Sequence, residues 1–254
     1  MVFEGLFGNQ MKAIIRAIGI TFLVASLAAC STLSVDDDVQ RQLTADPFEP
    51  VNRTVFAFND RADKLVLKPA AKAYNYVLPQ PVKKGVSNFF GNLQEPANVV
   101  NNLLQGKFDR ALASTFRFTV NSTIGVLGLV DVAKTLSVEP AKEDFGQTMA
   151  AWGVGPGPYI MLPLFGPSNL RDGIGRFSEN AIYYPISEFG DSSSVQLGLS
   201  LTSVISSRVD LLGTDELIDS QLDPYAFLKQ AFEQQRIESL YDGNAPVVEQ
   251  DFDF

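Results

Sequence analysis

The stretch FDRALASTFRFTVNSTIGVLGLVDVA, residues 108–133, contains the two features that decide the fold. In its first half, Phe108, Leu112 and Phe116 recur at helical spacing on one side, and Arg117 lies off that side. The second half is apolar, carries two glycines and has no alternation of period two. The stretch therefore predicts an amphipathic helix followed by a glycine-spaced apolar element that is neither a strand nor long enough to span a membrane.

Helical spacing extends outward from this stretch over most of the chain. It predicts helices over residues 51–67, 86–104, 170–184, 192–212 and 224–240. The predicted apolar face of the first helix comprises Val51, Val55, Phe58, Ala62, Leu65 and Val66. The last helix has the clearest ends, because Asp223 can cap it, Pro224 suits its first turn and Gly243 follows its end. We expect the helix over 86–104 to be interrupted at Gly91 and Pro96 and closed by Gly106.

A glycine- and proline-rich tract separates these helices. Residues 146–175 hold seven of the 19 glycines and four of the 14 prolines, and residues 152–159 are expected to be mostly loop. The run from Gly153 to Pro158 overlaps with a phosphate-binding GxGxxG pattern, but its last position is proline and no strand-then-helix frame surrounds it. Because no convincing series of alternating strands occurs, the predicted fold class is mainly α, as a single domain.

The composition excludes several classes of function. The 254 residues include no histidine and one cysteine, so histidine-based nucleophile pairs, HExxH zinc sites, internal disulfides and CxxC metal sites are all impossible. The formal net charge is −9, with no basic stripe, which disfavours nucleic acid as a partner. We expect no cofactor and no metal. An enzyme built on this chain would have to use carboxylates, lysine, tyrosine or a Ser-Lys pair.

The single cysteine, Cys30, follows a secretory signal. Lys12 and Arg16 precede a short uncharged apolar run, which ends in Leu-Ala-Ala-Cys at residues 27–30. This ending resembles the lipobox of bacterial lipoproteins, in which cleavage before the cysteine leaves a thiol that carries diacylglycerol. Acyl chains on Cys30 would anchor the protein without a spanning helix. By resemblance to enterobacterial lipoproteins, Ser31 at the next position indicates the outer membrane.

Two polar clusters have alternative interpretations. Asp46 and Glu49 form an acidic pair that could serve acid–base chemistry, but capping of the following helix is favoured. Glu95 and the asparagines of residues 92–102 could bind a polar headgroup or a carbohydrate. Composition favours the alternative that this asparagine face is solvated, on a helix bent at Pro96.

The glycine-spaced element also leaves two alternatives open. It could pack in the core, which is the default for an apolar run, or present a smooth surface to membrane lipid. In a lipidated protein we weigh these equally. Its members are Ile124, Gly125, Val126, Leu127, Gly128, Leu129 and Val130.

Taken together, an ordered set of motifs resembles the MlaA (VacJ) family of outer-membrane lipoproteins of Gram-negative bacteria. The matching stretches are the lipobox at 27–30, DPFEPVNRTVFAFN at 46–59, VLPQPVKKGVSNFFGNLQEP at 77–96, FRFTVNSTIGVLGLVDVA at 116–133, EDFGQTMAAWGVGPGPYIMLPLFGPSNLRDG at 143–173 and DPY at 223–225. Each stretch is only moderately specific, but a match to the whole set in order is very improbable by chance.

This resemblance implies a ring-shaped helical body that lies in the periplasmic leaflet of the outer membrane. It implies removal of mislocalised phospholipid from the outer leaflet and its delivery to a periplasmic lipid carrier, which feeds an ABC transporter in the inner membrane. Trimeric porins are implied as further partners. The implied channel-side element is the segment Ile124 to Val130, with Val132 at its end. The implied structural framework consists of Asn52, Arg53, Asn98, Asn102 and Trp152.

Two other functions remain as alternatives, namely a porin-associated scaffold and an envelope enzyme that uses Asp46, Glu49 or Glu95. The predicted organisation is a signal peptide over 1–29, with Met11 as an alternative start. A lipidated tether over 30–46, a helical domain over 47–243 and an acidic tail over 244–254 follow.

Overall fold

A computed structural model of the chain describes residues 45–183, 186 and 193–245. The predicted signal peptide, Cys30 and most of the predicted tether and acidic tail lie outside the described residues.

The described chain is mainly helical, which confirms the predicted class. Its first half contains α3 (Glu49–Ala62), the π-helical turn η1 (Asp63–Leu67), α4 (Lys68–Val77), α5 (Gln80–Leu104), α6 (Phe108–Thr123) and α7 (Val132–Thr135). Its second half contains α8 (Phe145–Ala151), β1 (Tyr159–Leu162), β2 (Gly166–Asn169), α9 (Leu170–Ile182), α10 (Ser193–Asp210), η3 (Leu212–Thr214), α11 (Asp215–Asp219) and α12 (Pro224–Leu240).

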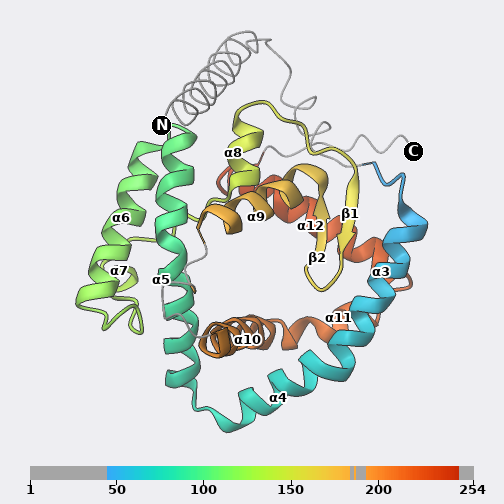
Figure 1. The fold of residues 1–254 in the computed structure, drawn as a ribbon, viewed down its shortest axis with the longest axis horizontal. Coiled ribbons are helices and arrows are strands. Elements are labelled where there is room, and N and C mark those ends of the chain that lie inside the picture. The colour runs from blue at the N-terminus through green and yellow to red at the C-terminus, as the bar shows by residue number, and fades with distance from the viewer. Residues whose placement is uncertain (1–44, 184–185, 187–192, 246–254) are drawn as a thin grey trace, which may run out of the picture.

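These elements are arranged around a ring (Figure 1). Helices α3, α4 and α5 follow one another along the right, lower and left sides of the view, and α6 packs along the outside of α5. The hairpin β1–β2 and helices α8, α9 and α12 form the upper side, while α10 and α11 lie between the upper side and α4. Segments from all parts of the described chain therefore contribute to one ring.

Most predicted helix ends agree with the structure. Asp223 accepts a hydrogen bond from the amide of Ala226 and Pro224 begins α12, while Gly106 and Gly243 adopt the left-handed backbone that ends a helix. The predicted interruption of α5 is wrong, because the helix continues through Gly91 and Pro96. A proline inside a helix removes one amide donor, and the rest of this 25-residue helix tolerates that loss.

The antiparallel hairpin was not predicted. Tyr159 pairs with Asn169 and Leu162 pairs with Gly166, so each strand has only four residues. Such short strands, in a tract rich in glycine and proline, leave almost no alternation to detect in the sequence.

Asparagines of α3 complete the outer edge of β1. The amide of Asn52 donates to the Tyr159 carbonyl at 3.1 Å and accepts from the Met161 amide at 2.9 Å. Asn59, two turns later, donates to the Leu162 carbonyl and accepts from the Leu164 amide in the same way. The side chains of one helix therefore provide the hydrogen bonds that a third strand would otherwise make.

A small aromatic core lies behind this edge. Tyr159, Met161 and Tyr225 are buried together, and Phe56 and Phe232 pack against them. The rings of Tyr159 and Tyr225 meet edge to face with their centroids 6.1 Å apart.

The predicted apolar face of α3 and η1 is mostly exposed. Asn52 is the buried residue of α3, whereas Val51, Phe58, Leu65 and Val66 of that face are exposed and Val55 packs against the aromatic core. The predicted capping by Asp46 is wrong: Phe48 occupies the N-cap position without a side-chain bond. The Asp46 carboxylate instead accepts hydrogen bonds from Asn52 and from the Tyr225 hydroxyl.

The hydrogen bonds between Asn52 and β1 yield a prediction about stability. Replacing Asn52→Ala strands the buried Tyr159 carbonyl and Met161 amide, so we expect it to lower the free energy of unfolding by about 2 kcal/mol. Chemical denaturation in detergent measures this loss. Thr54→Ala on the exposed side of α3, where the hydroxyl bonds the Pro50 carbonyl of the same helix, is the matched control and should change stability by less than about 0.5 kcal/mol. An equal loss of unfolding free energy in both variants would show that the hydrogen bonds of Asn52 do not stabilise the hairpin.

Candidate functional site

The interior of the described chain is polar and much of its surface is apolar. Nine apolar residues are buried, against sixteen polar or charged ones. Large apolar side chains are instead exposed along whole helices, as with Tyr76 and Val77 on α4 or Phe108 and Leu112 on α6. A protein that is stable in water alone rarely exposes so much apolar surface, so the outer surface is suited to contact with lipid.

A row of asparagines on α5 forms the polar interior. Asn98 donates to Glu95 and accepts from the Glu143 amide, and Asn102 donates to the Ala141 carbonyl at 3.0 Å. Asn102 is fully buried and Asn98 is almost so. The expectation that this asparagine face is solvated is therefore wrong. Asn98 and Asn102 are buried because they bind the segment around residues 141–143, whereas Asn92 binds Ser122 of α6 and Asn101 binds Glu179 of α9.

Arg117 connects α5 and α6 to the glycine-spaced element. Its guanidinium contacts Glu95 at 2.7 Å and Asp131 at 3.0 Å, and it donates to the Val138 carbonyl at 2.6 Å. Burial opposes ionisation of Asp131, but the hydrogen bonds from Arg117, Lys134 and Asn121 outweigh it and lower the pKa of this carboxyl. The buried charges are thus paired and hydrogen-bonded, as a buried ion pair requires.

The glycine-spaced element is a tight loop between α6 and α7. Its amides and carbonyls bond within the loop and to the end of α6, and Asn88 of α5 donates to the Leu129 carbonyl at 3.1 Å. A Cβ atom on Gly125 would lie 2.2 Å from the Val130 carbonyl oxygen, and one on Gly128 would lie 2.6 Å from the Asn92 side chain. Both glycines are therefore required by close packing.

The side chains of this loop point outward. Ile124, Val126, Leu127, Leu129 and Val130 are all exposed, and Leu127 is 68% exposed. Packing of the element in the core is therefore wrong. Val126 and Leu127 adopt positive φ angles of 54° and 58°, a strained conformation for such side chains. The apolar side chains of the loop therefore point away from the protein, while its backbone is fixed by hydrogen bonds to α5 and α6. We call these hydrogen-bonded residues of α5 and α6, with Asp131, the polar base of the loop.

A polar cavity of about 580 Å³ adjoins this base. It lies between α5, α6, the start of α8 and α10, and its lining includes Asn92, Glu95, Asn98, Arg117 and Asp131. Ser203, Ser206 and Ser207 line it from the side of α10. Amides, hydroxyls and charges thus surround a space large enough for a small polar group.

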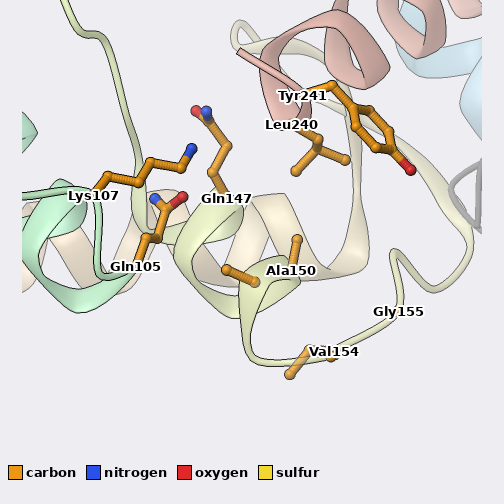
Figure 2. Close-up of a pocket in the computed structure, with 10 residues that line it drawn as sticks. Gln105, Lys107, Gln147, Ala150, Val154, Gly155, Leu240 and Tyr241 are labelled. Atoms are coloured by element: carbon orange, nitrogen blue, oxygen red, sulfur yellow. The ribbon is translucent and has the colours of Figure 1, made fainter. Parts of the chain in front are cut away.

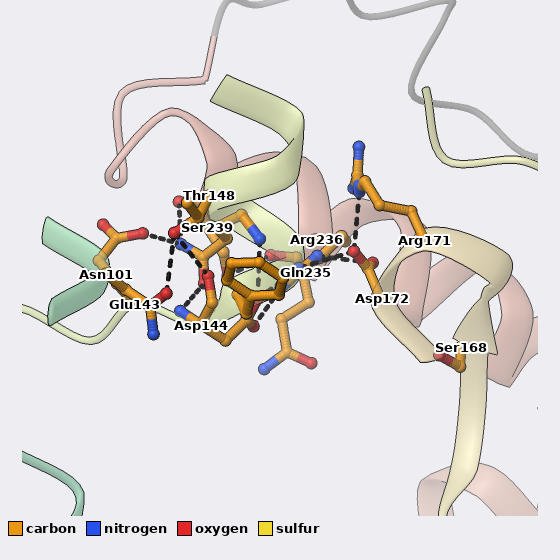
Figure 3. Close-up of polar contacts among 12 residues, drawn as sticks. Asn101, Glu143, Asp144, Thr148, Ser168, Arg171, Asp172, Gln235, Arg236 and Ser239 are labelled. Atoms are coloured by element: carbon orange, nitrogen blue, oxygen red, sulfur yellow. Dashed lines mark hydrogen bonds and ion pairs between the residues drawn. The ribbon is translucent and has the colours of Figure 1, made fainter. Parts of the chain in front are cut away.

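A second polar network fixes the upper side of the ring (Figure 3). Arg236 of α12 contacts Asp144 at 2.6 Å and Asp172 at 2.7 Å, which joins α8, α9 and α12. Burial opposes ionisation of Asp144, but the hydrogen bonds from Arg236 outweigh it and lower the pKa of this carboxyl. On the other side of α8, the Thr148 hydroxyl donates to Asn101 of α5.

A smaller pocket of about 330 Å³ opens where α8 and α12 end (Figure 2). Lys107, Gln147, Val154 and Tyr241 are among the side chains around it. The ammonium of Lys107 is already held by Glu143 and Asp242, at 3.0 and 2.8 Å. This pocket is therefore polar on one side and has no unpaired lysine to attract an anion.

The five residues expected to form the framework lie in two regions of the ring. Asn98 and Asn102 are in the polar interior, and Trp152 donates to the Leu104 carbonyl at the end of α5. Asn52 binds β1, and Arg53 pairs with Glu49 and Asp223. The Arg53 guanidinium lowers the pKa of Asp223 to about 2.

The carboxylates proposed for catalysis are not brought together. Glu95 is paired with Arg117 inside the ring, Glu49 pairs with Arg53 on α3, and Asp46 binds Tyr225. Arg117, Asn121 and Glu143 were not predicted as site residues from the sequence. For Arg117 and Asn121 a signal did exist, since both lie on the side of α6 opposite its apolar residues.

Among the described residues, no helix is long and apolar enough to cross a membrane, and no cluster of acidic or thiol side chains could hold a metal ion. A mainly helical ring with a polar interior and an apolar outer surface defines a class of proteins that work in contact with lipid.

Comparison with known proteins gives the family. A sequence model described as MlaA lipoprotein matches residues 44–239, so the chain belongs to the MlaA lipoprotein family. The chain is 35% identical over 224 residues to the intermembrane phospholipid transport system lipoprotein MlaA of Escherichia coli K12, with 86% of this chain and 84% of that protein covered. The protein of the same name in Haemophilus influenzae is 30% identical over 230 residues, with 88% and 90% covered.

A solved structure has the same fold. It is described as the structural basis for maintenance of bacterial outer membrane lipid asymmetry, and it superimposes with a TM-score of 0.68 at 35% sequence identity. The match covers 79% of this chain and all of the other. The family predicted from the ordered motifs is therefore confirmed.

The ion pairs of Arg117 with Glu95 and Asp131 give a second prediction. Arg117→Met leaves Glu95 and Asp131 buried without their cation, so we expect a loss of about 3 kcal/mol in the free energy of unfolding. Arg61→Met, on the exposed side of α3, is the control and should cost less than about 0.5 kcal/mol. Denaturant titration in detergent compares the two. A small effect at Arg117 would mean that packing of α5 on α6 holds the region without the ion pairs.

The ion pair between Arg117 and Asp131 also makes the stability of the protein depend on pH. Because the folded-state pKa of Asp131 is lowered, its contribution to stability is complete above the unfolded pKa of about 4 and is lost as the pH falls below that value. Asp131→Asn should therefore reduce stability at neutral pH and weaken its decline below about pH 4.

Proposed function

We propose that this protein is the outer-membrane lipoprotein of an intermembrane phospholipid transport system. It takes up phospholipid that is mislocalised in the outer leaflet and passes it to a periplasmic lipid carrier, which preserves the lipid asymmetry of the outer membrane. The observation that carries this proposal is the polar interior inside an apolar outer surface, in a chain that matches the MlaA lipoprotein family over residues 44–239. The names of its relatives in E. coli and H. influenzae support it.

The physical requirements of lipid transfer suit this arrangement. A phospholipid has a charged headgroup, which needs polar contacts, and acyl chains, which must be kept from water. The cavity beside α5 offers amides, hydroxyls and charges, and the apolar loop over residues 124–130 and the outer helices offer surface for chains. The transfer breaks and forms no covalent bond, so it needs no nucleophile, metal or cofactor.

The proposal includes an anchor and partners. Acyl chains on Cys30 hold the protein in the periplasmic leaflet, where its apolar helices lie among lipid tails. The carrier and an inner-membrane ABC transporter receive the lipid, and trimeric porins are proposed as neighbours in the membrane. A porin-associated scaffold would share the anchor and the apolar surface, but it would have no need of a polar cavity.

Deletion of the protein tests the proposal directly. We expect deletion to raise the amount of phospholipid exposed on the cell surface, because the outer leaflet is no longer cleared, and the intact chain should restore the normal level. Surface phospholipid is measured by its accessibility to an added phospholipase. A chain with Cys30→Ser, made in equal amount, should fail to restore it. A deletion strain with unchanged surface phospholipid would favour the scaffold.

The glycine-spaced loop yields a more local prediction. Gly128→Val places a Cβ atom 2.6 Å from the Asn92 side chain at a φ of +88°, so the loop must shift. We expect the variant to stay in the outer membrane but to raise surface phospholipid, since the anchor is untouched and the lipid-facing tip is displaced. Gly198→Val on α10, where nothing lies within 4 Å, adds the same bulk and should behave as the wild type. Normal lipid asymmetry in the Gly128 variant would exclude the loop from the lipid pathway.

A further inference from the structure

A third cavity, of about 410 Å³, adjoins the larger cavity of about 580 Å³ beside α5. It lies between the end of α4, the start of α5 and the C-terminal half of α10. Both cavities are lined by Ser87, Ser206 and Asp210, so the two spaces meet at α10. The smaller cavity is further lined by Tyr74, Asn75, Gln80, Lys83, Lys84 and Val209.

The two cavities share Asp210 and otherwise differ in their charged residues. Around the larger cavity, Glu95 and Asp131 are paired with Arg117, and Asp144 with Arg236, while Lys142 has no ion-pair partner within 4.0 Å among the described residues. In the smaller cavity, Lys84 and Asp210 each lack an ion-pair partner within 4.0 Å among the residues that the structure describes, and they do not pair with each other. The smaller cavity is therefore lined by one positive and one negative charge that lie more than 4.0 Å apart.

Neighbouring side chains add polar groups to these charges. The Lys83 ammonium lies next to Lys84 in sequence and donates to the side chain and the carbonyl of Asn75, which holds it at the cavity. The Tyr74 hydroxyl is buried and has no hydrogen-bond partner among the described residues. A buried hydroxyl without a partner is uncommon, and a ligand oxygen would satisfy it.

The helices that line the cavity also carry exposed apolar side chains. Tyr76 and Val77, at the end of α4, are 92% and 71% exposed, and Val82 at the start of α5 is also exposed. None of the three lines the cavity, but each is close in sequence to residues that do. A ligand that fits both the charged cavity and these apolar side chains has a compact dipolar head and an apolar remainder.

We infer that this cavity binds the headgroup of a zwitterionic, amine-bearing phospholipid. The phosphate lies against Lys83 and Lys84, the primary or quaternary ammonium lies against Asp210, and the acyl chains leave over Tyr76 and Val77. An anionic headgroup would satisfy the lysines but leave Asp210 unpaired, so the site favours the zwitterion. The inference rests on the proposed function and adds the substrate class to it.

Calorimetric titration of the full chain in detergent tests the inference. The probes are short-chain phosphatidylethanolamine, short-chain phosphatidylglycerol, and glycerophosphoethanolamine, which carries the same head without acyl chains. We expect phosphatidylethanolamine to bind roughly tenfold more tightly than phosphatidylglycerol, as for one charge-assisted hydrogen bond. The chainless ester should bind more weakly than the lipid. Equal binding of ester and lipid would overturn a lipid as the ligand and indicate a free phosphate ester.

Two variants separate the roles of the charges. Asp210→Asn should weaken phosphatidylethanolamine roughly tenfold and leave phosphatidylglycerol unchanged, because only the amine contact is lost. Lys84→Gln should weaken both lipids to a similar extent. Lys72→Gln and Glu216→Gln change exposed charges outside the cavity and should alter neither affinity. The inference is overturned if Asp210→Asn weakens both lipids alike or if neither cavity variant changes binding.

Failure of this inference differs from failure of the proposed function. If deletion of the protein leaves surface phospholipid normal, the proposed function fails whatever the titrations show. If deletion raises surface phospholipid but both cavity variants bind and complement normally, only the headgroup site is wrong. The thermal midpoint of each variant should match the wild type, since neither Lys84 nor Asp210 has an ion-pair partner among the described residues.

Discussion

The row of asparagines on α5 and the arginine that faces it make up the interaction on which the rest of the structure depends. A buried amide or charge is tolerated only when it has partners, and each of these side chains has them in a different segment. Asn98 and Asn102 hold the segment before α8, and Arg117 holds α6 and the loop after it. The ring is therefore fixed from inside by directional bonds, where most proteins of this size would rely on apolar packing.

This interior leaves the apolar side chains free for another environment. The helices α4 and α6 expose their large apolar residues because their opposite faces carry Ala71, Ala111 and Ser114, which permit close approach of neighbouring helices. In water such a surface would drive association, whereas among lipid tails it costs nothing. The same sequence pattern thus supports a stable interior and a lipid-compatible exterior.

The sequence was sufficient for most of the long helices and for the family, but not for α4 and α8 or for the direction in which the helices face. Caps and glycine stops located α12 and the end of α5, because those signals are local. Helical spacing located the apolar face of α3 but not its exposure, because apolar residues face inward as a rule only in a protein surrounded by water. The partners of Arg117 could not be predicted, since Glu95, Asp131 and Val138 come from separate segments. The hairpin was missed because four-residue strands carry too little pattern.

The asparagines of α3 have a further effect on the small hairpin. A strand edge with free amides and carbonyls can be extended by a strand of another chain, and two-stranded sheets are the least protected of all. Asn52 and Asn59 occupy that edge of β1 with bonds from a helix. Strand addition at β1 is thereby blocked, and any protein that joins this side of the ring must do so through side chains.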